Sequence, residues 1–367
     1  MRRSQNRYSG YRGRRTANDL LKRIALVLAV LVALVLGGLF LGQDYIVFTD
    51  NGLRLDLPFF RRETQEPLDP GSVSVVVRPK EPEDNEPEDQ QPEEQQPVPE
   101  EAMAAVELPV SALLDGTAAQ RLEEAGANSL ILEMKDREGR LAWRFRQELA
   151  VQSGVPMGTE EMNEALQLWN EGGVYTVARV CCFRDNTLPY QRNEVALRAG
   201  YGNWRDELGL RWLNPDSQAA RTYLADLCEE LAQLGFDEIL LECCQFPCRG
   251  NLEAVVPNGS FADGGFETVM AGFLSQLGER LEPYGTVLSL RADRDALADG
   301  AAGSGLTAAA LESGVDRIWM EEDGQEPATV ELLSQAGLSE PEQRLVVLAP
   351  ALDGESAAPQ AVLEEMT

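Results

Sequence analysis

From residue 104 to residue 367 the sequence alternates between short apolar runs and longer amphipathic stretches. Strands are predicted at 105–110, 129–134, 175–182, 238–244, 286–291, 317–320 and 344–348. Helices are predicted between them, at 117–125, 159–170, 217–234, 266–281 and 328–336. Repeated strand–helix alternation is typical of a parallel sheet covered by helices. This pattern leaves only a few α/β architectures open to the chain.

The segment 104–367 has 264 residues, which suits a (β/α)8 TIM-like barrel, a fold of about 250 residues. Only seven strands are evident, so either the barrel is incomplete or an eighth strand carries no clear signal. An open doubly wound sheet is the alternative. No glycine-rich fingerprint follows the first strand, so nucleotide binding has no support and no cofactor is expected.

An apolar stretch near the N-terminus predicts a membrane anchor at 24–42. Residues 24–41 contain no charge and would span about 27 Å as a helix, close to the thickness of a bilayer core. The basic tail at 1–23 carries a net charge of +7 and should stay in the cytoplasm, which places the rest of the chain outside. A cleaved signal peptide is the alternative, but no small-residue cleavage site follows.

Two accessory segments are predicted between the anchor and the barrel. In 43–78, two short strands flank Asp50, Asn51 and Gly52, which is a hairpin signal. The stretch 79–103 is rich in Pro, Glu and Gln and has little apolar surface to bury, so a disordered linker is expected. The barrel domain would then begin at residue 104.

Charge and composition exclude several functions. The chain has a net charge of −29 and no histidine. Without histidine, Ser-His-Asp and Cys-His nucleophile systems and histidine-containing metal sites are excluded. Outside the basic tail the net charge is −36, which would repel phosphates, so no nucleic-acid partner is expected.

Polar side chains follow or end most of the predicted strands. The carboxyl ends of parallel strands converge on one side of a barrel, where active sites are built. A charged group facing inward there is costly unless it is paired or functional. The residues concerned are Glu133, Lys135 and Asp136 on the second strand, Arg179, Arg184 and Asp185 on the third, Glu242 and Gln245 on the fourth, Arg291 on the fifth, and Glu321 on the sixth.

Four separated motifs carry a family resemblance. They are NSLILEMKDREG at 128–139, VYTVARVCCFRDN at 174–186, GYGNWRDELGLRWLNP at 200–215 and GFDEILLECCQFP at 235–247. Their order and spacing resemble DUF4015, a family of glycoside hydrolase-like barrels, and in particular its membrane-anchored Gram-positive forms. In the fourth motif Glu242 stands where the family usually has Asp, and Gln245 where it usually has Arg.

The resemblance implies a TIM barrel that acts on or holds carbohydrate. Two carboxylates would then flank the glycosidic bond. Glu242 is the expected acid, with a pKa raised by its apolar and thiol neighbours, and its partner would be Asp185, Glu133 or Glu321, in falling order of preference. Substrate would be bound by Lys135, Arg179, Arg184, Trp204, Gln245 and Arg291.

Aromatic and thiol groups near these motifs have alternative interpretations. Trp204 and Trp212 are suited to stacking on sugar rings, although they would equally pack a loop onto the barrel. The six cysteines are best explained as buried free thiols. A disulfide from Cys248 is chemically allowed outside the membrane, and a thiolate metal site lacks the usual spacing, so no metal is expected.

Two functions follow from these expectations. The first is a membrane-anchored, extracytoplasmic glycoside hydrolase that acts on or binds cell-envelope or environmental polysaccharide. The alternative is a catalytically inactive glycan-binding or structural envelope protein on the same barrel.

Overall fold

The structure is a computed structural model that describes residues 102–297, 303–322, 328–354, 356 and 358–364, together with the backbone of 46–49 and 52–55. The chain forms two units, Met1–Pro92 and Glu93–Thr367. In the first unit, β1 (Ile46–Thr49) and β2 (Gly52–Leu55) pair as an antiparallel hairpin. The predicted basic tail and anchor, and all of the predicted linker before Ala102, lie outside the described residues.

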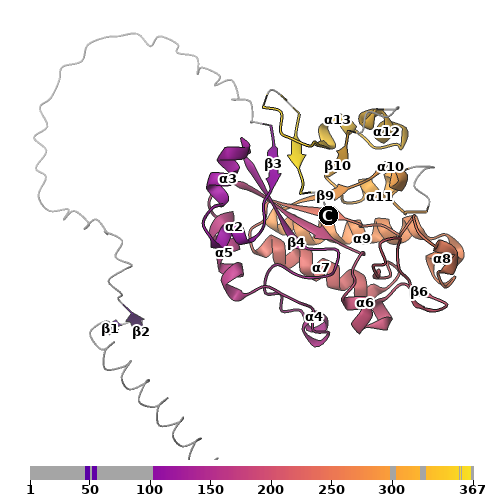
Figure 1. Cartoon of the computed structure of the whole chain (residues 1–367), viewed down its shortest axis with the longest axis horizontal. Helices are drawn as coiled ribbons and strands as arrows, with labels where there is room; N and C mark the ends of the chain where they lie inside the picture. The colour runs from indigo at the N-terminus through magenta and orange to yellow at the C-terminus, as the bar shows by residue number, and fades with distance from the viewer. Residues whose placement is uncertain are drawn as a thin grey trace, which may run out of the picture. The chain divides into compact units, whose positions relative to one another are not determined.

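The second unit is a closed barrel of eight parallel strands, so the predicted (β/α)8 barrel is confirmed (Figure 1). The strands follow one another in chain order around the barrel, and the last pairs with the first. They are β3 (Ala104–Glu107), β4 (Ser129–Lys135), β5 (Tyr175–Cys181), β8 (Glu238–Glu242), β9 (Val287–Arg291), β10 (Arg317–Glu321), β11 (Leu345–Leu348) and β12 (Gln360–Val362).

The strand that the sequence did not reveal is β12. It has three residues, too few for a periodic pattern, yet it pairs with both β11 and β3 and so closes the barrel. The doubly wound alternative is therefore wrong.

Helices follow the strands around the barrel. The longer ones are α3 (Ala118–Ala125), α5 (Glu160–Asn170), α7 (Gln218–Gln233), α9 (Phe266–Leu281) and α12 (Thr329–Gln335). Short helices are α2 (Ser111–Leu114), α4 (Glu148–Gln152), α6 (Leu188–Gln191), α8 (Ser260–Asp263), α10 (Arg294–Leu297), α11 (Ala308–Glu312) and α13 (Pro341–Arg344). Two-residue strands β6 (Arg198–Ala199) and β7 (Gly202–Asn203) form a small hairpin in the segment between β5 and α7.

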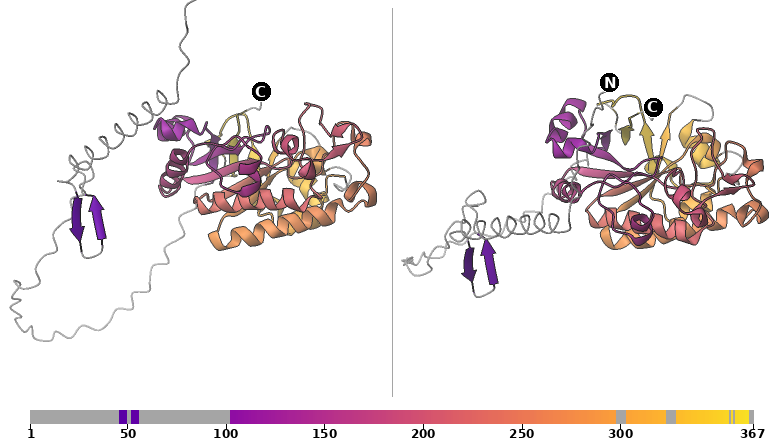
Figure 2. Two further views of the ribbon diagram at one scale, coloured as in Figure 1. Left: turned by 90° about the horizontal axis from the view of Figure 1, so that it is seen from below. Right: turned by 60° about the horizontal axis from the view of Figure 1, so that its bottom comes forward.

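The sequence of α7 shows why these helices pack against the barrel. Its hydroxyl cap Ser217 accepts a hydrogen bond from the backbone N–H of Ala220, which satisfies a donor in the first turn. Tyr223, Leu224, Leu227 and Leu231 repeat at helical spacing and are all buried. Figure 2 shows α7 and α9 side by side along one flank of the barrel.

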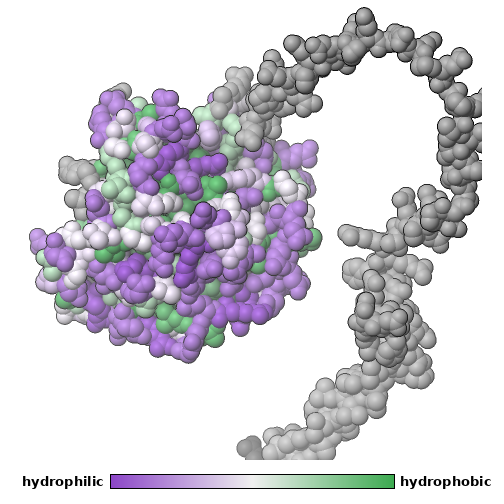
Figure 3. Space-filling model, turned by 180° about the vertical axis from the view of Figure 1, so that it is seen from behind, coloured by the Kyte–Doolittle hydropathy of each residue, from purple (hydrophilic) through white to green (hydrophobic). Residues whose placement is uncertain are grey.

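The core has two layers. Inward-facing residues fill the barrel, among them Ile131, Val177, Leu240 and Trp319, while a larger cluster lies between the strands and the helices. The face of this domain in Figure 3 is mostly hydrophilic, with hydrophobic residues in small groups. Among the described residues no helix is long and apolar enough to cross a bilayer.

Candidate functional site

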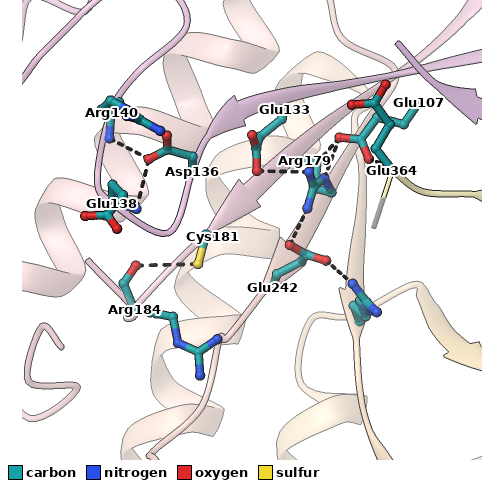
Figure 4. A network of polar contacts seen from close by, with 11 residues as sticks. Glu107, Glu133, Asp136, Glu138, Arg140, Arg179, Cys181, Arg184, Glu242 and Glu364 are labelled. Carbon is teal, nitrogen blue, oxygen red and sulfur yellow. Dashed lines mark hydrogen bonds and ion pairs between the residues drawn. The ribbon is translucent and has the colours of Figure 1, made fainter. Parts of the chain in front are cut away.

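Arg179, on β5, is the centre of an ion-pair network at the carboxyl ends of the strands (Figure 4). Its Nη2 lies 2.6 Å from Oε1 of Glu107 and 2.9 Å from Oε1 of Glu133, and its Nη1 lies 2.8 Å from Oε2 of Glu242. The three carboxylates come from β3, β4 and β8, so one guanidinium joins these three strands to β5. These strands are neighbours in the sheet, in the order β3, β4, β5 and β8, so their carboxyl ends lie side by side.

Glu242 is bound by a second guanidinium on its other side. Nη1 of Arg291, at the end of β9, lies 2.7 Å from Oε1 of Glu242. The Nη2 atom of the same guanidinium lies 2.8 Å from Oε1 of Glu321, at the end of β10. Cations and anions therefore alternate along the row Glu133, Arg179, Glu242, Arg291 and Glu321.

The two arginines determine the ionisation of Glu242. Burial alone would raise its pKa, but the charges and hydrogen bonds of Arg179 and Arg291 outweigh burial and hold the pKa below its ordinary value. The expected general acid with a raised pKa is thus wrong for Glu242. Its thiol neighbours matter less than the two cations, and the side chain is a carboxylate at neutral pH.

The pKa of Glu133 is shifted in the opposite direction to that of Glu242. Partial burial raises its pKa, and this effect outweighs the lowering by Arg179, while Asp136 and Glu242 raise it further. Its side chain is 37% exposed, so it can meet a ligand. Glu107 also has a pKa raised by burial, but only 4% of its side chain is exposed, and it accepts the backbone N–H of Glu364 at 2.8 Å.

Two clefts open beside the network. The Glu242 cleft, of about 570 Å³, is lined by Glu242, Arg291 and Glu321 together with Arg184 and Trp212. The Glu133 cleft, of about 720 Å³, is lined by Glu133, Glu107 and Arg179. The Arg179–Glu242 ion pair joins the walls of the two clefts.

The pair Lys135 and Asp185, expected to bind substrate and to supply a carboxylate, is buried away from both clefts. Nζ of Lys135 lies 3.0 Å from Oδ2 of Asp185, and neither side chain has any exposed surface. The ammonium group also donates to the carbonyl oxygens of Cys181, at 2.7 Å, and Cys182, at 3.3 Å. Asp185 accepts the backbone N–H groups of Thr187 and Leu188. The donors of Lys135 are used and Asp185 is enclosed, so both residues support the loops.

Trp204 is also buried and does not reach a cleft. Its Nε1 donates to the carbonyl oxygen of Asn251 at 2.8 Å, and it meets Trp212 edge to face. Stacking on a sugar ring would need an open ring face, so this expectation is wrong and the packing alternative holds. Trp212 is 4% exposed and lines the Glu242 cleft.

Two further predicted residues do line the Glu242 cleft. Arg184 lies 2.7 Å from Asp206 and 5.5 Å from the ring centroid of Trp212. Gln245 donates to the sulfur of Cys248 at 3.2 Å. The fourth motif has Gln245 in place of an arginine, and the cations that contact Glu242 are Arg179 and Arg291.

Sequence reasoning missed Glu107 and Asp206. Glu107 ends the first strand in the structure, but the predicted strand ran on to residue 110, so the rule applied to the other strand ends did not select it. Asp206 lies in a loop and gave no such signal, but it accepts both Arg184 and the Nε1 of Trp212.

All six cysteines are free thiols. Within the described ranges no group of three or more Cys, Asp or Glu side chains is arranged to hold a metal ion.

Comparison with known proteins identifies the family. Residues 112–293 match the model of DUF4015, described as "Putative glycosyl hydrolase domain", and no curated protein matches the chain. A hypothetical protein from Ruminiclostridium thermocellum is 22% identical over 50% of this chain and 96% of its own, with a TM-score of 0.43. The glycoside hydrolase domain of PgaB (BpsB) from Bordetella bronchiseptica is 13% identical over 72% of this chain and 94% of its own, with a TM-score of 0.49.

A GH20 exo-β-N-acetylglucosaminidase from Vibrio harveyi is 9% identical over 72% of this chain and 50% of its own, also with a TM-score of 0.49. The closed strand order, and not these distant likenesses, establishes the fold. The matched segment contains Glu133, Arg179, Glu242 and Arg291. Residues 112–293 of this chain therefore form a domain of the DUF4015 type, a "Putative glycosyl hydrolase domain".

Proposed function

We propose that this protein is a glycoside hydrolase in which ionised Glu242 and protonated Glu133 act together on a polysaccharide. The observation that carries the proposal is the pair of hydrogen bonds from one guanidinium, that of Arg179, to both carboxylates. The distance between the nearest oxygens of Glu242 and Glu133 can be no greater than the lengths of these two hydrogen bonds plus the width of the guanidinium group. That distance lies within the limit of about 9.5 Å for glycosidase carboxylates.

The different environments of the two groups divide the chemistry. Glu242 has a lowered pKa, so it is the anionic partner that attacks the anomeric carbon or activates the attacking water. Glu133 has a raised pKa, so it protonates the leaving glycosidic oxygen. Arg179 holds both side chains in place.

A polysaccharide fits the shape of the site better than a small sugar. Glu242 lines one cleft and its ion-pair partner Arg179 lines the other, and both clefts are lined by polar and charged groups that can bind hydroxyls. Trp212 offers a small aromatic surface in one of them. A glycan chain would cross both clefts, with the bond to be cleaved above the ion pair.

The test is release of reducing ends from a panel of polysaccharides by the purified full chain. Glu242→Gln and Glu133→Gln should each lower the rate by at least about a hundredfold, because each removes a reacting carboxyl group. Glu321→Gln, in the same row, should retain most of the rate, and exposed Glu160→Gln is a remote control. Full turnover by both Glu242→Gln and Glu133→Gln would contradict the proposal.

A second candidate is glycan binding without catalysis. It is favoured by the complete pairing of Glu242, because each of its oxygens already accepts a hydrogen bond from an arginine, as in a structural ion network. Co-sedimentation with insoluble polysaccharide would measure this binding. Binding by the wild type without release of reducing ends would select this candidate.

We also propose that the barrel is held outside the cytoplasmic membrane by residues 24–42, with cell-envelope or environmental polysaccharide as its ligand. The support is the uncharged run at 24–41 behind a basic tail. Deletion of residues 1–42 should move the protein from the membrane pellet to the soluble fraction. Protease added to intact protoplasts should digest the barrel of the undeleted chain, and resistance of the barrel to that protease would contradict the orientation.

A further inference from the structure

Two pairs of cysteines meet where β5 and β8 end. Cys181 is the register partner of Glu242, and Cys243 follows Glu242 directly. Beyond the strands the backbones remain paired: the N–H of Cys182 donates to the carbonyl of Glu242 at 2.7 Å, and the N–H of Phe183 to that of Cys243 at 3.2 Å. Cys181 therefore lies diagonally opposite Cys243, and Cys182 diagonally opposite Cys244.

Cys243 has an unusual backbone conformation. Its φ is 47°, in the left-handed region that residues other than glycine rarely adopt. Its side chain lines the Glu242 cleft and is partly exposed, whereas Cys181 beneath it is 2% exposed. Strain of this kind clusters at functional sites.

The two thiols have different protonation tendencies. The interaction with the neighbouring thiol of Cys181 lowers the pKa of Cys243; burial and the charge of Glu242 oppose this effect, and Arg184 and Arg291 lower the pKa further. The same interaction and burial raise the pKa of Cys181 well above its ordinary value. One sulfur is therefore inclined to be a thiolate while the other keeps its proton, as required of an attacking and a resolving cysteine.

The spacing is suitable for a disulfide. Neighbouring strands are about 4.8 Å apart and residues rise about 3.3 Å along a strand, so diagonal Cα atoms lie about 6 Å apart. Disulfides usually join Cα atoms separated by about 5.5 to 6 Å. Cys181 and Cys243 can therefore be joined with little backbone movement.

We propose that Cys243 and Cys181 form a peroxide-reactive pair at the mouth of the barrel, separate from the hydrolytic chemistry. The Cys243 thiolate attacks one oxygen of a hydroperoxide; the O–O bond breaks, an alkoxide or hydroxide leaves, and Cys243 becomes a sulfenic acid. The Cys181 sulfur then attacks the Cys243 sulfur, the S–O bond breaks, and the Cys181 proton leaves with the hydroxyl group as water. The peroxide gains two electrons, and the two sulfurs lose them in forming one S–S bond.

Oxidation would also change the wall of the Glu242 cleft. Sγ of Cys181 donates to the carbonyl oxygen of Arg184 at 3.5 Å, and a disulfide sulfur has no proton to donate. Arg184 and Glu242 both line this cleft. Glu242 precedes Cys243 in the chain and is the register partner of Cys181, and the carbonyl of Arg184 is the group that would lose its hydrogen bond.

The chain provides two matched controls. Cys182 and Cys244 have the same diagonal spacing but are 0% and 1% exposed, so peroxide cannot reach them. Cys248 lines the same cleft and is partly exposed, but burial and then Asp293 raise its pKa to about 11, so it stays a thiol. The pair Cys182 and Cys244 therefore tests disulfide spacing without access for peroxide, and Cys248 tests access for peroxide without a thiolate.

The experiment treats the reduced full chain with hydrogen peroxide and follows its intact mass. The wild type should lose two hydrogens and regain them with a reducing agent, and fragmentation between the adjacent cysteines should assign the bond to Cys181 and Cys243. Cys181→Ser should instead accumulate a sulfenic acid at Cys243 that a dimedone probe traps. Cys243→Ser should slow oxidation by at least about tenfold, while Cys248→Ser should behave as the wild type.

Circular dichroism of each variant will show that it is folded, and labelling of the wild type by dimedone at limiting peroxide requires no variant. Labelling first at Cys248, a bond between Cys182 and Cys244, or no oxidation at Cys243 in the folded wild type would each overturn the proposal. Because the readout is mass, failure of the hydrolase proposal would leave this result unaffected.

Discussion

At the scale of single residues, cations decide what each carboxyl group of the site can do. Glu242 and Glu133 lie on the same guanidinium, yet the pKa of one is lowered and that of the other is raised. The difference arises because Glu242 has a second cation, Arg291, whereas Glu133 has acidic neighbours. The opposite pKa shifts of the two glutamates, and the different roles proposed for them, therefore follow from their neighbours and not from their residue type.

This division predicts the pH dependence of the proposed hydrolysis. Activity needs Glu242 ionised and Glu133 protonated. On raising the pH, kcat/KM should therefore rise through the pKa of Glu242, below its ordinary value of 4.5, and fall through the pKa of Glu133, above that value. Arg291→Gln should move the acid limb to higher pH, because one of the two cations is lost. An acid limb that does not move in this variant would contradict the assignment of Glu242.

A second prediction tests the structural role of Asp185. Asp185→Asn leaves Lys135 buried without its counter-ion, so the free energy of unfolding should fall by about 3 to 5 kcal/mol. The kcat of the folded fraction should remain near that of the wild type, because neither residue lines a cleft. Urea unfolding and kcat on the same samples will check both points.

The control for Asp185→Asn is Asp226→Asn. Asp226 pairs with Arg280 where both side chains are about 30% exposed, and a pair of this kind contributes no more than about 1 kcal/mol. Loss of kcat in Asp185→Asn without loss of stability would restore Asp185 as a catalytic candidate.

At the scale of elements, the strands carry a second polar network at their amino ends. Glu238, the first residue of β8, is 0% exposed and accepts hydrogen bonds from four side chains. Tyr175 on β5 donates at 2.9 Å, Trp319 on β10 at 2.9 Å and Arg317 at 2.7 Å, and Ser289 on β9 also donates. One carboxylate thus joins four neighbouring strands below the packed interior.

Removal of this carboxylate should destabilise the barrel without changing any residue that lines the two clefts. Glu238→Ala leaves the donors of Ser289 and Trp319 buried without an acceptor and Arg317 without its partner, so the free energy of unfolding should fall by about 3 to 5 kcal/mol. Urea unfolding measures the loss, and Glu160→Gln, in an exposed ion pair, should change it by less than about 1 kcal/mol. Equal effects of the two variants would show that the network contributes little.

Strand prediction succeeded where the side chains carried a pattern. The runs that form β4, β5 and β8 are apolar because both faces of these strands are covered, and their bounds were found within a few residues. The same reasoning failed for β12, because its three residues are defined by hydrogen bonds to β11 and β3 rather than by their own side chains.

At the scale of the whole molecule, closure depends on that short strand. The N–H of Gln360 donates to the carbonyl of Met103 at 2.9 Å, and the N–H of Ala349 to that of Ala361 at 2.9 Å. Without β12, the barrel would have two open strand edges and an exposed interior.

A chain that ends at Pro359 should therefore lose cooperative unfolding and aggregate. A chain that ends at Glu364 keeps β12 and the contact of Glu364 with Glu107, so it should unfold as the full chain does. Thermal unfolding followed by circular dichroism, together with light scattering, distinguishes the two. A cooperative transition in the shorter chain would show that β12 is dispensable.

The amino-acid sequence by itself determined the α/β class, the absence of histidine chemistry, and the placing of Glu133, Arg179, Glu242 and Arg291 at strand ends. These features are local, since periodicity and residue type depend only on neighbours in the chain. The tertiary structure alone decided that Arg179 and Arg291 share Glu242, that Lys135 and Asp185 are buried together, and that Trp204 packs inward. Charges act through space and burial depends on loop paths, so the ionisation of each carboxyl group is established only in the folded barrel.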